Sequence, residues 1–340
     1  MMNDQLRVGL IGLGTMGRIH AQNLLQSVSD ARLEAVADPH IASIEEQGLI
    51  RLPKHVHRFS QYQDLLALDL DAVVVASATT THEVVLWDVL HVARPVLCEK
   101  PIGMTLDVSR ALVQAFDSAG VPLQVGFMRR YDPLYRRAYE LIQDGAIGMP
   151  YHFWSLSRDQ FAPPIDVVRY SGGFWLDTGV HDYDLAHWLM ADTIDSVYAR
   201  GGVFLSQGYE TVGDVDQMHV SFSTHSGKLG LVELGRNAIY GYDIRTEILG
   251  EKGAIQVLTG NRTSTVLMLK DQMIGDTFRH YAERFREAYQ AELAHFIDAV
   301  RNGRPVGVSG DDALQAQAVA VAVHRSLESH QPTTVTTAIK

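Results

Sequence analysis

The sequence predicts a two-domain α/β protein. The first domain has a parallel sheet, and the second is an α+β domain with a large, open-faced, mostly antiparallel sheet. Short β-branched runs alternate with helical patterns over the first third of the chain, as in parallel α/β sheets. A glycine-rich turn joins the first of these runs to a helical pattern. Beyond about Gly148, short strand-like runs follow one another through glycine-containing turns, which indicates antiparallel pairing.

The first domain is expected over residues 1–126. Its strands are rich in Val, Ile and Leu, and "DLDAVVVASATT" is nearly continuously apolar, as expected when helices cover both faces of a sheet. The expected strands lie in residues 6–14, 32–40, 69–80, 94–102 and 121–127. Helical patterns follow the first strand, as "TMGRIHAQNLLQS", and the fourth, as "TLDVSRALVQAFDSAG".

The second domain is expected over residues 127–340. Its strands are short and several are separated by turns such as "HSGK" and "GEKG", which favour hairpins. The expected strands lie in residues 150–158, 196–204, 216–224, 228–235, 243–250 and 253–259. Two helices close the chain, at residues 280–303 and 311–329, and Gly303 with Pro305 ends the first of them.

Composition narrows the class of protein. The chain is 46% hydrophobic and 20% charged, as soluble globular proteins are, and no apolar run approaches the ~20 residues that span a bilayer. The N-terminus lacks the layout of a signal peptide, and the single cysteine, Cys98, fits a reducing compartment. A net charge of −11 argues against nucleic-acid and anionic-membrane partners. These features predict a cytoplasmic protein of enzyme size.

The turn after the first strand carries a G-x-G-x-x-G pattern, and an acidic residue follows about 20 residues later at the end of the second strand. Glycine permits the tight turn and the close approach of a pyrophosphate to the helix N-terminus, where unpaired N–H groups favour an anion. A glycine turn used only for packing is the alternative. The residues expected to bind a dinucleotide here are Gly12, Gly14, Thr15, Met16, Gly17 and Asp38.

Asp38 also indicates which dinucleotide is bound. Its carboxylate would accept hydrogen bonds from the adenosine ribose hydroxyls and would repel a 2′-phosphate. The following residues, Pro39, His40 and Ile41, offer no arginine to pair with that phosphate. The sequence therefore predicts NAD as the cofactor rather than NADP.

Lys100 lies in "CEKP", at the carboxyl end of a predicted parallel strand, where open α/β sheets bind their ligands. Pro101 disfavours helical geometry at Lys100, so the side chain is expected to be extended and able to polarise a substrate oxygen. A surface lysine in a turn is the alternative. "SATTTHE" closes a neighbouring strand, and its His82 either contacts the cofactor or only begins a helix. Further expected cofactor contacts are Ser77, Thr79, His82, Glu99 and Lys100.

The stretch "FWLDTGVHDYDLAHWL" places aspartates and histidines among apolar residues. Asp177 and His181 are four residues apart and share a face on a helix. A metal site would need more converging ligands, and the sequence has no HExxH or cysteine cluster to supply them. A capping aspartate with a core histidine is the structural alternative. Gly172 and Gly173 just before the stretch are expected to bring its start close to another backbone or to a ligand.

Alcohol oxidation by hydride transfer requires three groups of the kinds found here. A base removes the hydroxyl proton, a cation stabilises developing alkoxide charge, and a carboxylate fixes a neighbouring hydroxyl. Carboxylates have a reference pKa of about 3.9 and histidines of about 6.5, so a histidine is the better base near neutrality. The sequence predicts His181 as the base, Lys100 as the cation and Asp177 as the orienting carboxylate, with no metal.

The motifs together resemble those of the Gfo/Idh/MocA oxidoreductases, and within that family the inositol 2-dehydrogenases. "GLIGLGTMGRIHAQNL" and "CEKPI" are general to the family, while "GFMRRYDP", "SRDQFAPP" and "YGYD" resemble the inositol branch. The resemblance implies a catalytic set of Lys100, Asp177 and His181. It also implies that Arg129 lies near the nicotinamide and the substrate, and that further side chains line the substrate pocket. These further residues are Asp159, Tyr240 and Tyr242.

The sequence leaves the identity of the substrate open within a narrow class of compounds. "DTGVHDYD" replaces the more usual "DMTIHD", and Ser157 stands where some relatives have a histidine. The resemblance therefore implies a cyclic polyol such as myo-inositol, another inositol isomer, or a pyranose sugar. A protein that senses a dinucleotide or sugar without turnover is the alternative from a different class, although the lysine and histidine needed for turnover are present.

Assembly is predicted from the second domain. Apolar residues alternate along "MHVSF", "LGLVEL" and "TEILG" on one side, and the two terminal helices are too few to cover a wide sheet. An uncovered apolar face marks an interface. The sequence predicts a homo-oligomer, and the family resemblance implies a tetramer.

Overall fold

The computed structural model describes residues 5–336 and divides into two compact units. The first unit combines residues 1–131 with residues 287–314, and the second combines residues 132–286 with residues 315–340. The sequence-based boundary at residue 126 lies close to the first break. The sequence-based prediction divided the chain at one point only, so it did not predict that residues 287–314 belong with the N-terminal unit.

The first unit contains a six-stranded parallel sheet in the order β3-β2-β1-β4-β5-β6. This is the strand order of dinucleotide-binding Rossmann domains, which bind their ligand where the order reverses, beyond the carboxyl ends of the strands. The strands are β1 (Leu6–Ile11), β2 (Ala31–Ala37), β3 (His57–Phe59), β4 (Ala72–Val75), β5 (Val96–Cys98) and β6 (Leu123–Val125).

Helices pack against this sheet and contact its strands β1, β2, β3 and β4. They are α1 (Thr15–Gln26), α2 (Ile41–Glu46), α3 (Tyr62–Leu66), α4 (Thr79–His91), α5 (Leu106–Ala119) and α11 (Arg286–Asn302), with the 3₁₀ helix η1 (Met128–Tyr131) after β6. The core that β1 and β2 share with α1 also contains three buried side chains of α11, namely Leu293, Phe296 and Ile297. Their burial in this core explains why residues 287–314 belong to the first unit.

The second unit contains a seven-stranded sheet in the order β12-β11-β7-β10-β9-β8-β15. All neighbours pair antiparallel except β7 and β10, which are parallel. The strands are β7 (Pro150–Arg158), β8 (Ile194–Gly202), β9 (Gln217–Thr224), β10 (Leu229–Gly235), β11 (Asp243–Gly250), β12 (Gly253–Val257) and β15 (Thr333–Thr334). The mostly antiparallel sheet expected from the sequence is thus observed, with one parallel pair at its centre.

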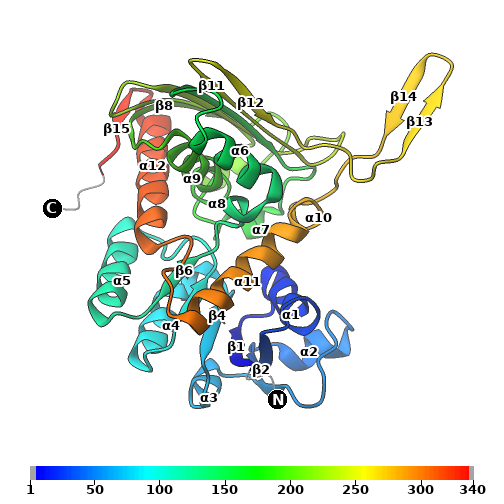
Figure 1. Ribbon diagram of the computed structural model, residues 1–340, viewed down its shortest axis with the longest axis vertical. Coiled ribbons are helices and arrows are strands. Elements are labelled where there is room, and N and C mark those ends of the chain that lie inside the picture. The colour runs from blue at the N-terminus through cyan, green and yellow to red at the C-terminus, as the bar shows by residue number, and fades with distance from the viewer. Residues whose placement is uncertain (1–4, 337–340) are drawn as a thin grey trace. The chain divides into compact units, whose positions relative to one another are not determined.

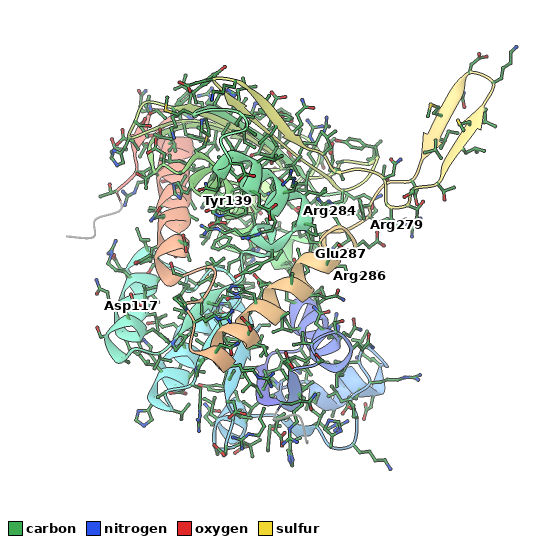
Figure 2. All side chains as sticks on the ribbon, in the orientation of Figure 1. Asp117, Tyr139, Arg279, Arg284, Arg286 and Glu287 are labelled. Atoms are coloured by element: carbon green, nitrogen blue, oxygen red, sulfur yellow. The ribbon has the colours of Figure 1, made fainter. Side chains whose placement is uncertain are left out.

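Helices of the second unit lie on one side of this sheet (Figure 1), and α9 contacts both β7 and β10. They are α6 (Pro133–Gln143), α7 (Ile165–Val168), α8 (Phe174–Asp177), α9 (Gly179–Met190), α10 (Tyr281–Arg284) and α12 (Gly310–Ser329), with the 3₁₀ helix η2 (Tyr209–Val212). Tyr139 of α6 (Figure 2) stacks on Trp188 of α9, with ring centroids 4.5 Å apart. The sequence did not predict the hairpin β13 (Val266–Leu269) and β14 (Gln272–Gly275), which extends away from the sheet.

The apolar residues that alternate along the sheet face the helices. Met218, Val220, Val232 and Leu234 are fully buried within the single chain, so they form its core and do not supply an uncovered apolar face. The opposite side of the sheet carries their strand neighbours, among them Glu233, because successive side chains point to opposite faces. The apolar alternation therefore does not itself argue for an interface. No helix in residues 5–336 is long and apolar enough to cross a membrane.

A homo-oligomer remains our prediction, now supported by the broad sheet face that no helix covers in Figure 1. We expect sedimentation equilibrium at micromolar concentration to give a multiple of the chain mass of 37.7 kDa, and a tetramer by family resemblance. A charge reversal at Arg200, an exposed residue of β8 near the edge of this face, should shift the distribution towards smaller species. A mass equal to one chain throughout the micromolar range would contradict the prediction.

Candidate active site

The glycine-rich turn has the geometry that a pyrophosphate needs. Gly12 has a φ of 93°, and a Cβ there would lie 2.5 Å from the Ser77 backbone. A Cβ on Gly17 would lie 2.0 Å from the Gly12 carbonyl oxygen, so the third glycine permits close packing of helix and strand. Apart from its chain neighbours and the adjacent helix backbone, no atom of residues 5–336 lies within 4 Å of a Cβ built on Gly14, at the N-cap of α1. The turn is therefore tight on two sides and open at the helix N-terminus, which fits an approaching anion.

Asp38 follows β2 and lies against this turn. One carboxylate oxygen accepts a hydrogen bond from the backbone N–H of Leu13 at 2.7 Å, and the other accepts one from His40 N–H at 2.8 Å. A carboxylate offers about four acceptor sites, so the two remaining sites can receive the paired hydroxyls of a ribose. The backbone bonds hold the carboxylate in place before any ligand arrives.

We expect the value of kcat/KM with NAD to exceed that with NADP by a factor on the order of 10 or more, because an unpaired like-charge contact costs at least ~1.4 kcal/mol. Steady-state kinetics with both cofactors at one substrate concentration measures this ratio. Asp38→Ser, which removes the charge and keeps a hydrogen-bonding group, should lower the ratio. Equal efficiency of the two cofactors with the unmodified protein would refute the assignment of Asp38.

His82 is a structural residue of the same unit. Its ring is 1% exposed, with Nδ1 at 2.8 Å from the Pro101 carbonyl oxygen and Nε2 at 3.1 Å from that of Ser77. Burial lowers the pKa of His82 despite these two hydrogen bonds. The ring therefore links the end of β4 to the turn after β5, and its role as a cofactor contact stays a prediction. Ser77 itself accepts a hydrogen bond from Thr81 Oγ1, and Thr79 begins α4.

Lys100 follows β5 and Glu99, and its peptide bond to Pro101 is cis. Its position beyond the carboxyl end of a parallel strand agrees with the region where this fold binds ligands. Arg129 lies in η1, just after β6, and is 2% exposed. The roles of Lys100 and Arg129 stay predictions.

Asp177 and His181 lie on either side of a break between two helices of the second unit. Asp177 ends the four-residue helix α8, and α9 begins at Gly179. Thr178, with φ −105° and ψ −48°, separates them. The single continuous helix implied by their spacing is therefore wrong, although the backbone keeps turning, since His181 N–H donates to the Thr178 carbonyl oxygen at 3.2 Å. His181 is 8% exposed and Asp177 is half-buried.

A buried ion pair fixes the start of α8. Asp214 accepts a hydrogen bond from Phe174 N–H at 3.0 Å and pairs with Arg236 at 3.1 Å, and the Arg236 and Asp214 side chains are only 1% and 2% exposed. The Arg236 guanidinium also lies over the Phe174 ring, 4.2 Å from its centre. Motif analysis missed Asp214 and Arg236, because nothing in their spacing connects them to the stretch that begins at Phe174.

The two glycines before α8 serve the helix itself. Gly172 and Gly173 have φ values of 82° and 93°. A Cβ on Gly173 would lie 2.3 Å from the Trp175 ring, and one on Gly172 would lie 2.7 Å from the Leu176 side chain. The close neighbours of these glycines are therefore side chains of α8, and an approach to a ligand stays a prediction.

The other polar residues of α9 have structural partners. Both Asp182 carboxylate oxygens accept from the Ser157 hydroxyl, at 3.0 and 2.8 Å, which ties α9 to β7. His187 Nε2 accepts from Ile194 N–H at 3.2 Å. Within residues 5–336, the one group of three side chains spaced to hold a metal ion lies elsewhere, in the first unit.

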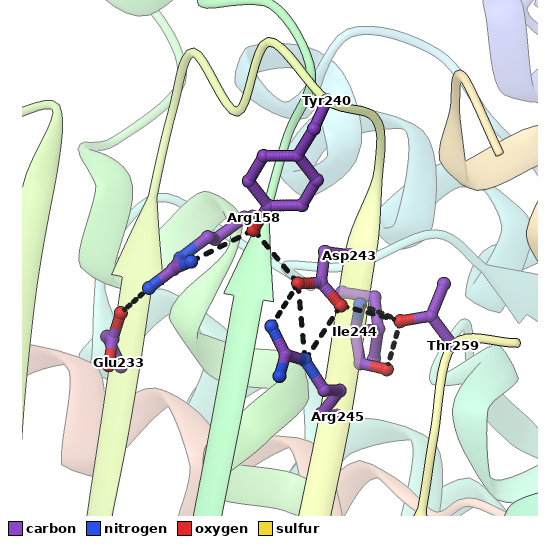
Figure 3. Close-up of polar contacts among 7 residues, drawn as sticks. All are labelled: Arg158, Glu233, Tyr240, Asp243, Ile244, Arg245 and Thr259. Carbon is purple, nitrogen blue, oxygen red and sulfur yellow. Dashed lines mark hydrogen bonds and ion pairs between the residues drawn. The ribbon is translucent and has the colours of Figure 1, made fainter. Parts of the chain in front are cut away.

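The predicted substrate residues in "SRD" and "YGYD" lie in different surroundings. The Tyr240 hydroxyl accepts from Arg158 Nη1 at 2.9 Å and donates to Asp243 at 2.9 Å (Figure 3). Arg158 points away from the face on which Ser157 meets α9, so the Tyr240 hydroxyl lies on the uncovered side of the sheet. The role of Tyr240 as a substrate contact stays a prediction.

Tyr242 and Asp159 occupy different surroundings from Tyr240. The Tyr242 ring is 6% exposed and packs edge-on against Phe285, with centroids 6.3 Å apart. Asp159 follows β7, its N–H donates to the Gly235 carbonyl oxygen and its own carbonyl oxygen accepts from Ala238 N–H. The roles of Tyr242 and Asp159 as substrate contacts stay predictions.

Charged side chains stabilise the polar network around Tyr240. Burial by itself would raise the pKa of Asp243, but hydrogen bonds from Arg245, Thr259 and Tyr240 outweigh that effect and lower it. Arg158 in turn pairs with Glu233 on the neighbouring strand (Figure 3). Asp243 therefore stays ionised at neutral pH, and the network stiffens one end of the sheet without any group of the predicted catalytic set.

Comparison with known proteins identifies the family. Residues 6–127 match the family model described as "Oxidoreductase family, NAD-binding Rossmann fold", and residues 139–336 match its "C-terminal alpha/beta domain". The chain is 36% identical over 332 residues to a myo-inositol 2-dehydrogenase of Thermotoga maritima, with 95% of this chain and 96% of that protein covered. It is 34% identical over 333 residues to a scyllo-inositol 2-dehydrogenase (NAD(+)) of Bacillus subtilis, with 97% and 96% covered.

A solved structure agrees over the same length. Scyllo-inositol dehydrogenase from Lactobacillus casei, with bound NAD(H) and scyllo-inositol, superposes with a TM-score of 0.90 at 27% identity, covering 97% of this chain and 99% of that one. The predicted fold class, the predicted family and the prediction of NAD as cofactor are confirmed at this level. The chain belongs to the Gfo/Idh/MocA oxidoreductase family, and its first unit is an NAD-binding Rossmann domain.

Proposed function

We propose that this protein is an NAD-dependent dehydrogenase that oxidises a secondary hydroxyl of a cyclic polyol, with myo-inositol oxidised to 2-keto-inositol as the reaction we favour. The observation that carries the proposal is the likeness over at least 95% of the chain to two inositol 2-dehydrogenases, which covers both units. The open glycine turn and the fixed Asp38 carboxylate support the cofactor half of the reaction.

We assign one role to each residue of the predicted catalytic set. His181 takes the proton of the reacting hydroxyl through a ring nitrogen, Lys100 stabilises the oxygen as it becomes a carbonyl, and Asp177 holds a neighbouring hydroxyl. When bound, NAD supplies the nicotinamide carbon that accepts the hydride. The break at Thr178 supports different roles for Asp177 and His181, because the two residues belong to different helices.

The buried surroundings of His181 suit a base. A ring that is 8% exposed is protected from bulk water, which strengthens its interactions with a bound hydroxyl. The Asp182–Ser157 bonds and the Asp214–Phe174 bond hold the helices on either side of the break. These bonds support the proposed roles, because helices that are held before substrate arrives reduce the reorganisation that reaction requires.

A panel of inositol isomers and aldoses with NAD, followed by the absorbance of NADH, tests the proposal. We expect one or more inositols to be oxidised with a higher kcat/KM than glucose. A preference for an aldopyranose would replace the polyol with a sugar and leave the chemistry unchanged. Binding of NAD without NADH formation on any member of the panel would favour a sensing protein and contradict the proposal.

A further inference from the structure

A second cluster of titratable side chains lies in the first unit, at the residue before Lys100. It joins His20 of α1, Glu99 after β5 and Glu292 of α11. Each offers a nitrogen or oxygen within 4.8 Å of the other two, and none of the three residues is more than 8% exposed. The reaction assigned above uses neither His20 nor Glu292.

His20 and Glu99 already form a pair. His20 Nε2 lies 2.8 Å from Glu99 Oε1, and His20 Nδ1 has no hydrogen-bond partner. An N–H without a partner is costlier to bury than a bare ring nitrogen, so we assign the proton of a neutral ring to Nε2, which donates to Glu99. Glu99 then carries a negative charge that one donor partly compensates. Gly126 permits this position, since a Cβ there would lie 2.8 Å from Glu99 Oε2.

Glu292 is the member without a partner. Its side chain is fully buried, and neither carboxyl oxygen has a hydrogen-bond partner among residues 5–336. Three other side chains belong to its surroundings. Gln124 of β6 donates to the Glu292 backbone carbonyl oxygen at 3.3 Å, Tyr289 packs edge-on against His20, and Glu99 is the nearby charge. A carboxylate in such a place would have no cation to balance it and would repel Glu99.

We propose that Glu292 is a positioning residue: a neutral carboxylic acid that leaves Glu99 as the single negative charge of the cluster and so holds the strand end that leads into Lys100. A bound proton is the smallest change that makes both carboxyl groups compatible in one buried site. Burial and the charge of Glu99 both raise the pKa of Glu292 well above its usual range, in agreement with the geometry.

A divalent cation is the rival occupant, because a histidine with two carboxylates is a set of metal-type ligands. The proton is favoured on two grounds. His20 Nε2 is already engaged at hydrogen-bond distance to Glu99, and an ion would have to reach three residues that are almost entirely buried. The experiment below includes this rival as an outcome.

The test compares Glu292→Gln with the unmodified protein across pH. An acid whose pKa is raised by folding contributes stability that is present at low pH and lost as pH rises from about 4.3 towards the folded value. The amide of Gln cannot ionise, so E292Q does not lose this stability. The melting temperature of E292Q minus that of the unmodified protein should therefore increase by roughly 2–4 °C for each pH unit above about 4.3. Glu287→Gln, the same change on an exposed position of α11 (Figure 2), is the matched control and should show no such trend.

Two further measurements separate the possibilities. Infrared spectra should show the carbonyl band of a protonated carboxylic acid at neutral pH, and E292Q should lose it. Metal analysis of the purified protein should find no stoichiometric divalent ion. A melting-temperature difference that does not change with pH, an absent band, or one bound ion per chain that E292Q loses would each overturn the proposal.

The positioning role has a kinetic readout, which rests on the proposed function. E292Q should keep kcat within about twofold of the unmodified protein, whereas Glu292→Ala should lower kcat about tenfold or more at little change in KM, because small displacements of a catalytic group cost large factors in rate. Equal activity of both variants would remove the link to Lys100. A protein that oxidises no polyol would refute the proposed function, while the pH and infrared measurements would still decide the protonation of Glu292.

Discussion

His181→Ala should lower kcat for polyol oxidation by roughly 10²–10⁴, the usual contribution of a general base, while the affinity for NADH changes little. The reason is chemical. A hydride cannot leave the carbinol carbon unless the hydroxyl proton also leaves, and a base must lie within hydrogen-bond reach of it. Because only the unprotonated base accepts the proton, oxidation by the unmodified protein should also rise with pH, and His181→Ala should flatten that rise.

Steady-state kinetics of His181→Ala beside a fluorescence titration with NADH measures both effects. His91→Ala is the matched control, because His91 is an exposed histidine at the end of α4 and should leave kcat and NADH affinity unchanged. Near-normal turnover of His181→Ala would show that His181 is a core histidine, and the assignment of the base would fail.

Asp214→Ala should be the most destabilising of the single changes considered, with a loss of about 3–5 kcal/mol in the free energy of unfolding. The change leaves the Arg236 guanidinium buried without its partner, and it removes the acceptor for Phe174 N–H. Since α8 begins at Phe174 and ends at Asp177, we also expect kcat to fall in the fraction that stays folded.

Urea unfolding followed by circular dichroism measures the stability of Asp214→Ala. Glu140→Ala is the control, because it breaks the exposed pair of Arg137 and Glu140 on α6, and exposed pairs contribute about 0–1 kcal/mol. A loss for Asp214→Ala no larger than that of the control would mean that the buried pair does not hold α8 in place.

The parallel sheet could be predicted because its signals are local. A strand buried on both faces is continuously apolar, as in residues 72–75, and the glycine turn and Asp38 occur at a fixed spacing along the chain. The hairpin β13–β14 could not be predicted in this way. Leu267, Met268 and Met273 are more than half exposed, so its apolar residues do not alternate between a buried and a wet face.

The candidate site was predicted in its residue types but not in its local geometry. Asp177 and His181 stand in a stretch that is buried on nearly every side, since almost all of α9 is buried, and such a stretch gives no sign of a break at Thr178. The supporting pairs were missed for another reason. Asp214 with Arg236, and His20 with Glu99, join residues far apart in the sequence, and spacing rules describe only neighbours.

The return of α11 to the first unit has a consequence for synthesis on the ribosome. Residues 1–131 emerge first, yet the core of their sheet is completed by Leu293, Phe296 and Ile297. At 5–20 residues per second the intervening chain takes roughly 10–30 s to make. During that interval the nascent nucleotide-binding unit exposes the apolar surface that α11 later covers, and exposed apolar surface of this kind favours aggregation until residues 286–302 have been made.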